Sequence, residues 1–139
     1  MASHEINAKW EKKMSFSTEV SGHKLILDAD ESVGGEDNGP RPKPFMLVAL
    51  AGCTGMDVIS ILKKMQIEPS YFNVKVSGEL TEEFPKYYHT MHIVYEFKGD
   101  NLPLDKLQKA VDLSQEKYCG VSALYKKAIH ITSEIKVLV

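Results

Sequence analysis

The chain has 139 residues, of which 43% are hydrophobic and 26% are charged, and its formal net charge is −2. This length and balance fit one folded domain and argue against a disordered chain. The small net charge argues against a nucleic-acid partner, and we expect none.

The first third of the sequence predicts antiparallel strands. Mostly apolar residues occupy every second position from Ala8 to Val20, which is the period of a strand. Ser21 and Gly22 offer a turn, after which an extended run resumes at residues 23–27. We therefore expect a meander of two or three antiparallel strands.

Residues 31–44 predict a long loop because they are rich in glycine and proline. Prolines at positions 40, 42 and 44 stiffen its end, since each fixes its own φ. Arg41, the only arginine of the chain, lies in this stiff part and is presented in a restricted direction. Long loops of this kind are often functional.

A buried helix is predicted from Phe45 to about Met65, because its first half is apolar on all sides. A membrane span is the rival interpretation, but Asp57 interrupts the apolar run and Lys63 follows it closely, so we expect a core helix and no membrane partner. The first residues show no signal-peptide pattern, and we expect a cytoplasmic protein.

The second half of the sequence predicts a hairpin, two helices and a last strand. Residues 72–78 and 91–97 alternate as strands do. Pro103 opens a helix that Gly120 interrupts, and a second short helix follows before a strand from Ile129 to Val139. This order predicts an α+β fold with antiparallel sheets. The all-round apolar helix needs cover on every side, which predicts an intimate homodimer.

Two cysteines are the candidate chemical groups. Cys53 lies inside the apolar helix between small residues, and Cys119 lies at the break between the two later helices. A helix N-terminus close to Cys119 is expected to lower its thiol pKa. These residues together with Arg41 suit a redox site. The alternative is that both thiols are packed as small hydrophobic side chains, and the residues alone leave both possibilities open.

Other polar residues are less suited to catalysis. Asp57 shares a helix face with Cys53 and opposes a thiolate there, so we expect it to bind a backbone N–H or a lysine at a helix end or a dimer contact. His89 and His92 fall on opposite faces of a strand, which argues against a metal pair. Tyr118 and Tyr125 either line the site or simply pack.

Separated segments of the chain resemble the OsmC/Ohr family, the osmotically inducible protein C and organic hydroperoxide resistance proteins. They are Gly39–Pro42 with Ala49–Met65, and Glu116–Ser122. The likeness is nearest to the small, poorly characterised OsmC-like branch. It implies a single OsmC-like domain over residues 1–139, with antiparallel sheets around long central helices, and an intertwined homodimer.

The resemblance also implies thiol-dependent reduction of organic hydroperoxides. Cys53 is then the attacking thiolate and Cys119 the resolving thiol, and an external thiol such as a dihydrolipoyl protein restores the pair. Arg41 carries over as the guanidinium that favours the thiolate, and no metal or bound cofactor is implied. The glutamate that supports this arginine in the family has no counterpart in residues 42–45. A non-catalytic or redox-sensing dimer that binds a small molecule is therefore the alternative.

Overall fold

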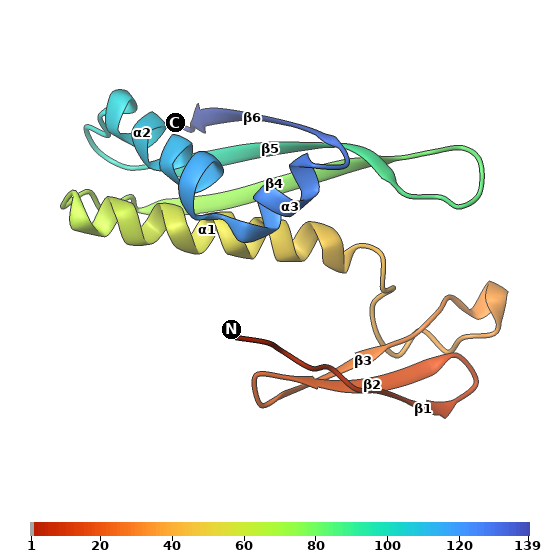
Figure 1. Ribbon diagram of the computed structural model, residues 1–139. Coiled ribbons are helices and arrows are strands. Elements are labelled where there is room, and N and C mark those ends of the chain that lie inside the picture. The colour runs from red at the N-terminus through yellow and green to blue at the C-terminus, as the bar shows by residue number, and fades with distance from the viewer. Residues whose placement is uncertain (1) are drawn as a thin grey trace. The chain divides into compact units, whose positions relative to one another are not determined.

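The computed structural model describes residues 2–139 and shows an α+β fold (Figure 1). Two three-stranded sheets are present, one with the order β1-β2-β3 and one with the order β4-β5-β6. The chain divides between Met46 and Leu47 into two compact units. The first unit holds the first sheet, and the second holds the second sheet with most of the helical residues.

The first unit is an antiparallel meander of β1 (Ala8–Lys12), β2 (Ser15–Val20) and β3 (His23–Leu27). The predicted meander is confirmed, with three strands. The run of alternating residues is not continuous, because a turn at Lys13, with φ of 49°, separates β1 from β2.

The loop after β3 is organised by one buried carboxylate. Asp28 is 3% exposed and accepts hydrogen bonds from the backbone N–H groups of Ala29 at 2.7 Å, Glu36 at 3.3 Å and Asn38 at 3.0 Å. These bonds, that from Asn38 above all, lower the pKa of the Asp28 carboxyl. The loop is irregular as predicted, apart from one 3₁₀ turn, η1 (Glu31–Val33).

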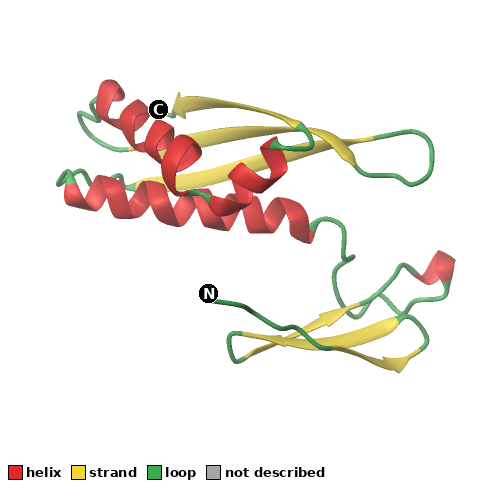
Figure 2. Ribbon diagram, in the orientation of Figure 1, coloured by secondary structure: helices red, strands yellow, loops and turns green. Residues whose placement is uncertain are grey.

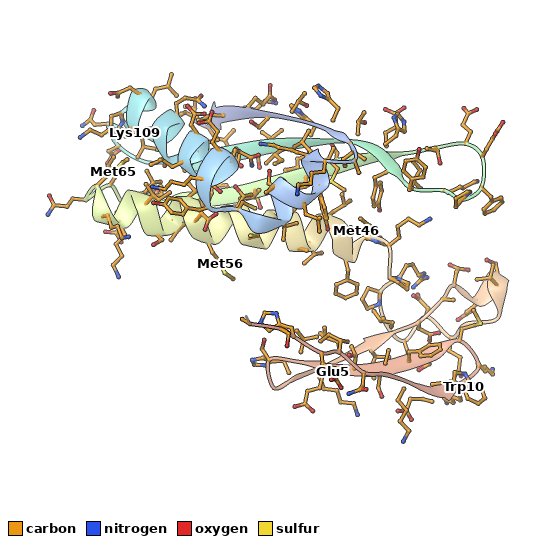
Figure 3. The ribbon with its side chains drawn as sticks, in the orientation of Figure 1. Glu5, Trp10, Met46, Met56, Met65 and Lys109 are labelled. Carbon is orange, nitrogen blue, oxygen red and sulfur yellow. The ribbon has the colours of Figure 1, made fainter. Side chains whose placement is uncertain are left out.

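The long helix α1 (Phe45–Lys64) confirms the predicted helix. Leu50, Val58 and Leu62 are fully buried along one face of it. Val48 and Met56 are 60% and 76% exposed, and Met56 points away from the second sheet (Figure 3). By length and composition α1 is also apolar enough to cross a membrane. Its buried face makes it a core helix, although the second unit does not cover it on every side.

The second sheet has one apolar and one polar face, because apolar and polar residues largely alternate along its strands. It consists of β4 (Tyr71–Leu80), β5 (Tyr88–Lys98) and β6 (His130–Val137). The predicted hairpin is confirmed by β4 and β5. Side chains of the apolar face pack into one core with α1, and they include Phe72, Val74, Val76, Met91, Ile93, Tyr95, Phe97, Ile131 and Ile135.

The prediction of purely antiparallel sheets is wrong for β6. This strand pairs parallel with β5, in a register from Thr90↔His130 to Phe97↔Val137. A parallel pair needs a long crossover connection. Here the helical segment between the two strands carries the chain back to the start of β5, so that β6 runs in the same direction.

That crossover consists of three helical pieces, which follow β5 and precede β6 along the chain and are drawn in red in Figure 2. They are α2 (Leu104–Leu113), a π-helical turn η2 (Ser114–Tyr118) and α3 (Gly120–Lys126). The predicted helix break is confirmed, and it falls at Cys119, whose backbone is extended, with φ of −77° and ψ of 100°. Helix α2 contributes Leu107, Ala110 and Val111 to the same core.

Candidate thiol site

The two cysteines meet in the second unit, together with one carboxylate. Cys53 lies on α1, Asp57 follows it one turn later, and Cys119 lies between η2 and α3. The two sulfur atoms and a carboxylate oxygen of Asp57 all lie within 4.8 Å of one another. Both thiols are free, Cys53 is half-buried and Cys119 is only 2% exposed. A small solute can thus reach the sulfur of Cys53 more easily than that of Cys119.

The π-helical turn before Cys119 sets the position of its sulfur. The Cys119 N–H donates to the Ser114 carbonyl at 2.8 Å, which closes the wide turn. The chain then restarts as α3, and the Ser122 N–H donates to the Cys119 sulfur at 3.3 Å. Cys119 is therefore the N-cap of α3. Single π-helical turns occur frequently at functional sites.

The acidity of Cys119 is opposite to the expectation from the helix end. Burial raises the pKa of its thiol to about 11, although the hydrogen bond from the Ser122 N–H acts in the other direction. The neighbouring Cys53 and Asp57 raise that pKa further, because a second negative charge beside either group is unfavourable. The prediction of a lowered pKa is wrong, and Cys119 is a neutral thiol at pH 7.

A buried chain of hydroxyl groups connects this site to the sheet. Thr54 Oγ1 lies 2.7 Å from both the Tyr95 hydroxyl and Ser114 Oγ. Ser114 Oγ donates to Asp57 Oδ2 at 2.9 Å, and Gln115 Nε2 donates to the Tyr95 hydroxyl at 2.7 Å. Thr54, Tyr95 and Ser114 are each fully buried. Each of these hydroxyls thus has a protein partner on both sides, as buried polar groups require.

The carboxylate of Asp57 fixes the direction of this chain. Since Ser114 gives its only hydroxyl proton to Asp57, Thr54 has to donate to Ser114. Thr54 then has no proton left for Tyr95, so the Tyr95 hydroxyl donates to Thr54. All three hydroxyls point their protons toward the carboxylate. The Ser114 hydroxyl is a partner of Asp57 that was not predicted, and the predicted contact of Asp57 with a lysine or backbone N–H in a dimer stays a prediction.

A pocket opens beside Asp57 on the surface of the second unit. Asp57, Lys64 and Tyr118 lie in its lining, and Tyr118 is 53% exposed. Tyr125 packs against the core that includes Cys119, and burial together with the charge that Cys119 can carry raises the pKa of its hydroxyl. The pocket gives solvent a route to the Asp57 carboxylate.

Arg41 lies in the first unit, where acidic groups hold its guanidinium. It donates to Asp37 Oδ1 at 2.8 Å and to the Gly39 carbonyl at 2.9 Å, and Asp30 lies 3.4 Å away. The bond to Asp37 raises the pKa of the guanidinium. Asp37 is thus a partner of Arg41, whereas its neighbour Glu36 pairs with lysines 12 and 13. The part that Arg41 takes in the chemistry stays a prediction.

Sulfur and carboxylate oxygen are donor types that zinc accepts. Among residues 2–139, Cys53, Asp57 and Cys119 gather as three such donors. A structural zinc site takes four protein donors. We interpret the cluster as a thiol site and assign no metal to it. His92 belongs elsewhere, since its ring contacts Thr132 and Glu134 on β6.

The hydroxyl chain was not predicted from the sequence. A signal for its first part exists, because Thr54 and Asp57 are polar residues one turn apart within an apolar helix, and buried polar groups need partners. Its other members, Tyr95, Ser114 and Gln115, come from a strand and from a helix end far along the chain. Their approach depends on the tertiary structure.

The fold is α+β, and two thiols lie beside a carboxylate between a core helix and a π-helical turn. These features define the class as proteins with a dithiol site. One protein family matches most of the chain. The chain belongs to the OsmC-like protein family, whose model matches residues 35–134.

The chain is similar to Protein YhfA of Escherichia coli K12, with 33% identity over 135 residues that cover 96% of this chain and 98% of that protein. It is also similar to the crystal structure of a hypothetical protein from Aquifex aeolicus VF5, with 30% identity, complete coverage of both chains and a TM-score of 0.83. The crystal structure of an organic hydroperoxide resistance protein OsmC from Legionella pneumophila shares the fold, with a TM-score of 0.68 at 16% identity, over 99% of this chain and all of that one.

Proposed function

We propose that this protein reduces organic hydroperoxides with the thiols of Cys53 and Cys119. The observation that carries the proposal is the proximity of the two sulfurs, which lie within 4.8 Å of each other although their residues come from different helical segments. A disulfide needs about 2 Å between the sulfurs. A small displacement of Cys119, which sits at a break between helical segments, brings them into bonding distance.

The family supports the same chemistry. The Legionella relative with the same fold is an organic hydroperoxide resistance protein by name. The family match of the present chain includes both cysteines. We extend the activity that this name suggests to the present chain because of its own pair of neighbouring thiols.

The two thiols have different roles in the proposed reaction. The Cys53 thiolate attacks the terminal peroxide oxygen, the O–O bond breaks, and an alcohol leaves after taking up a proton. Cys53 is thereby oxidised to a sulfenic acid. Cys119 then attacks this sulfur, forming a disulfide and releasing water. An external dithiol of the dihydrolipoyl class reduces the disulfide to two thiols and is itself oxidised to a disulfide. Cys53 is the better attacking group because it is the more exposed of the two.

We further propose that the protein works as a homodimer. Beyond its buried face, α1 exposes Val48, Met56 and Ile59, which are 43–76% accessible. A shallow, mostly apolar surface follows this side of α1, and its lining includes Gly52, Gly55 and Phe72. The small residues on α1 allow a second helix to approach closely. A second copy of this chain suits such a surface, and sedimentation analysis at micromolar concentration is expected to show twice the mass of one chain.

The peroxidase proposal is tested by titration. Reduced protein mixed with cumene hydroperoxide should consume one peroxide and two thiols per chain. A Cys53→Ser variant should consume none, and a Cys119→Ser variant should stop at a sulfenic acid that dimedone traps. An unchanged thiol titre after excess peroxide refutes the proposal. The predicted function of Arg41 is tested in the same assay, where Arg41→Lys is expected to slow the oxidation of Cys53.

A further inference from the structure

The resolving step of the proposed reaction requires the removal of a proton from Cys119. Cys119 has to lose its proton when it attacks the sulfenic acid, because only the thiolate is a good nucleophile. Burial of the sulfur and the neighbouring Asp57 charge raise the pKa of Cys119, so little of this thiol is ionised at pH 7. An efficient resolving step therefore needs a group that accepts this proton at the moment of attack.

The surroundings of Cys119 contain few groups that can accept a proton. The titratable groups that face Cys119 or Asp57 come from four elements, and they are Cys53, Asp57 and Lys64 of α1, Tyr95 of β5, Tyr118 of η2, and Tyr125 and Lys126 of α3. Burial raises the pKa of the Tyr95 and Tyr125 hydroxyls, which makes them poor proton acceptors. Asp57 is the carboxylate of this set, within 4.8 Å of the Cys119 sulfur.

The hydrogen bonds of Asp57 suit a proton acceptor. The directed chain from Tyr95 through Thr54 and Ser114 ends on Oδ2 of this carboxylate. Every proton in that chain points toward Asp57, so the chain holds this carboxylate in place. The pocket beside Asp57 gives the water that forms in the resolving step a route to solvent.

This inference rests on the proposed function. We propose that the carboxylate of Asp57 is the catalytic base of the resolving step. The S–H bond of Cys119 breaks and its proton passes to Asp57, while the Cys119 sulfur forms a bond to the Cys53 sulfur. The S–O bond of the sulfenic acid breaks, and the leaving hydroxide takes the proton from Asp57 and departs as water. The Cys119 sulfur is oxidised and the Cys53 sulfur is reduced, so no other oxidant is needed.

This role also gives a reason for a carboxylate beside a reactive thiol. The charge of Asp57 disfavours a second negative charge next to it. The Cys53 thiolate bears this penalty, whereas a neutral Cys119 does not, and Asp57 provides a base for the attack of Cys119.

The experiment isolates the attack by Cys119 without any peroxide. Ellman's reagent forms a mixed disulfide with the half-buried Cys53, and Cys119 then displaces the coloured thionitrobenzoate anion from it. Rapid mixing followed by absorbance gives the rate of this displacement. A Cys119→Ser variant should hold the adduct on Cys53 and release no second anion, which verifies the assay.

The variant Asp57→Asn keeps an oxygen that accepts the Ser114 hydroxyl but removes the base. We expect it to slow the release about 100-fold at pH 7, a size typical of general-base catalysis. Its rate should then rise about tenfold per pH unit as the thiolate fraction grows, and approach that of the wild type at high pH. The wild-type rate should change much less with pH.

Two further variants separate catalysis from structure. Ser114→Ala removes the hydrogen bond but keeps the carboxylate, so it should keep the shallow pH profile. Asp57→Glu should recover part of the rate at pH 7, and it tests the proposal even if the asparagine variant does not fold. The proposal is overturned if Asp57→Asn releases the anion at the wild-type rate at pH 7, or if its deficit is the same at every pH. Failure of the peroxidase proposal looks different, because displacement then stays normal while peroxide consumes no thiols.

Discussion

Replacing Thr54 by valine should destabilise the fold, although the two side chains have nearly the same shape. Thr54 is fully buried, accepts a hydrogen bond from Tyr95 and donates one to Ser114, both at 2.7 Å. Valine cannot do either. The Tyr95 hydroxyl then keeps its bond from Gln115 but has no acceptor for its own proton.

The size of the effect follows from these two bonds. A buried donor without a partner costs about 1–3 kcal/mol, and the lost donor to Ser114 adds about 1 kcal/mol. Ser114 still donates to Asp57, which limits its share. We therefore expect the free energy of unfolding to fall by about 2–4 kcal/mol.

Urea unfolding at one fixed protein concentration measures this change. Thr132→Val on β6 is the matched control, because it removes an exposed hydrogen bond, the one to the ring of His92 at 2.6 Å, and its effect should stay within about 1 kcal/mol. Tyr95→Phe removes the stranded hydroxyl, so the double variant with Thr54→Val should lose less than the sum of the two single changes. A loss below about 0.5 kcal/mol for Thr54→Val, or strict additivity in this cycle, refutes the account of the network.

Two further predictions concern Cys119 and the loop after β3. The pKa of Cys119 is raised in the folded state to about 11, so its contribution to stability is present at lower pH and is lost as the pH rises from about 9 towards 11. Unfolding measured across this range should show the loss in the wild type and less of it in Cys119→Ser. Gly35→Ala should destabilise the protein by more than about 2 kcal/mol, because the added methyl would lie 2.0 Å from the Ala29 carbonyl oxygen. Gly120→Ala meets nothing within 4 Å and serves as the control, and equal melting temperatures for the two variants would contradict this reasoning.

The elements of the fold could be predicted from the sequence because their signals are local. The alternating residues of the strands, the apolar run of α1 and the break at Gly120 all depend on neighbours a few positions away. The parallel pairing of β6 with β5 was missed, since strand direction depends on where the crossover places the chain. The single-domain organisation of residues 1–139 stays a prediction.

The two cysteines were identified from the sequence, because their small neighbours and the helix break are visible there and resemble a known family. The sequence also placed Asp57 on the helix face of Cys53, but only the tertiary structure brings the Cys119 sulfur to these two groups. It also decides the acidity of Cys119. A helix N-terminus favours the thiolate, but burial of the sulfur outweighs it, and burial depends on every element that packs around the site.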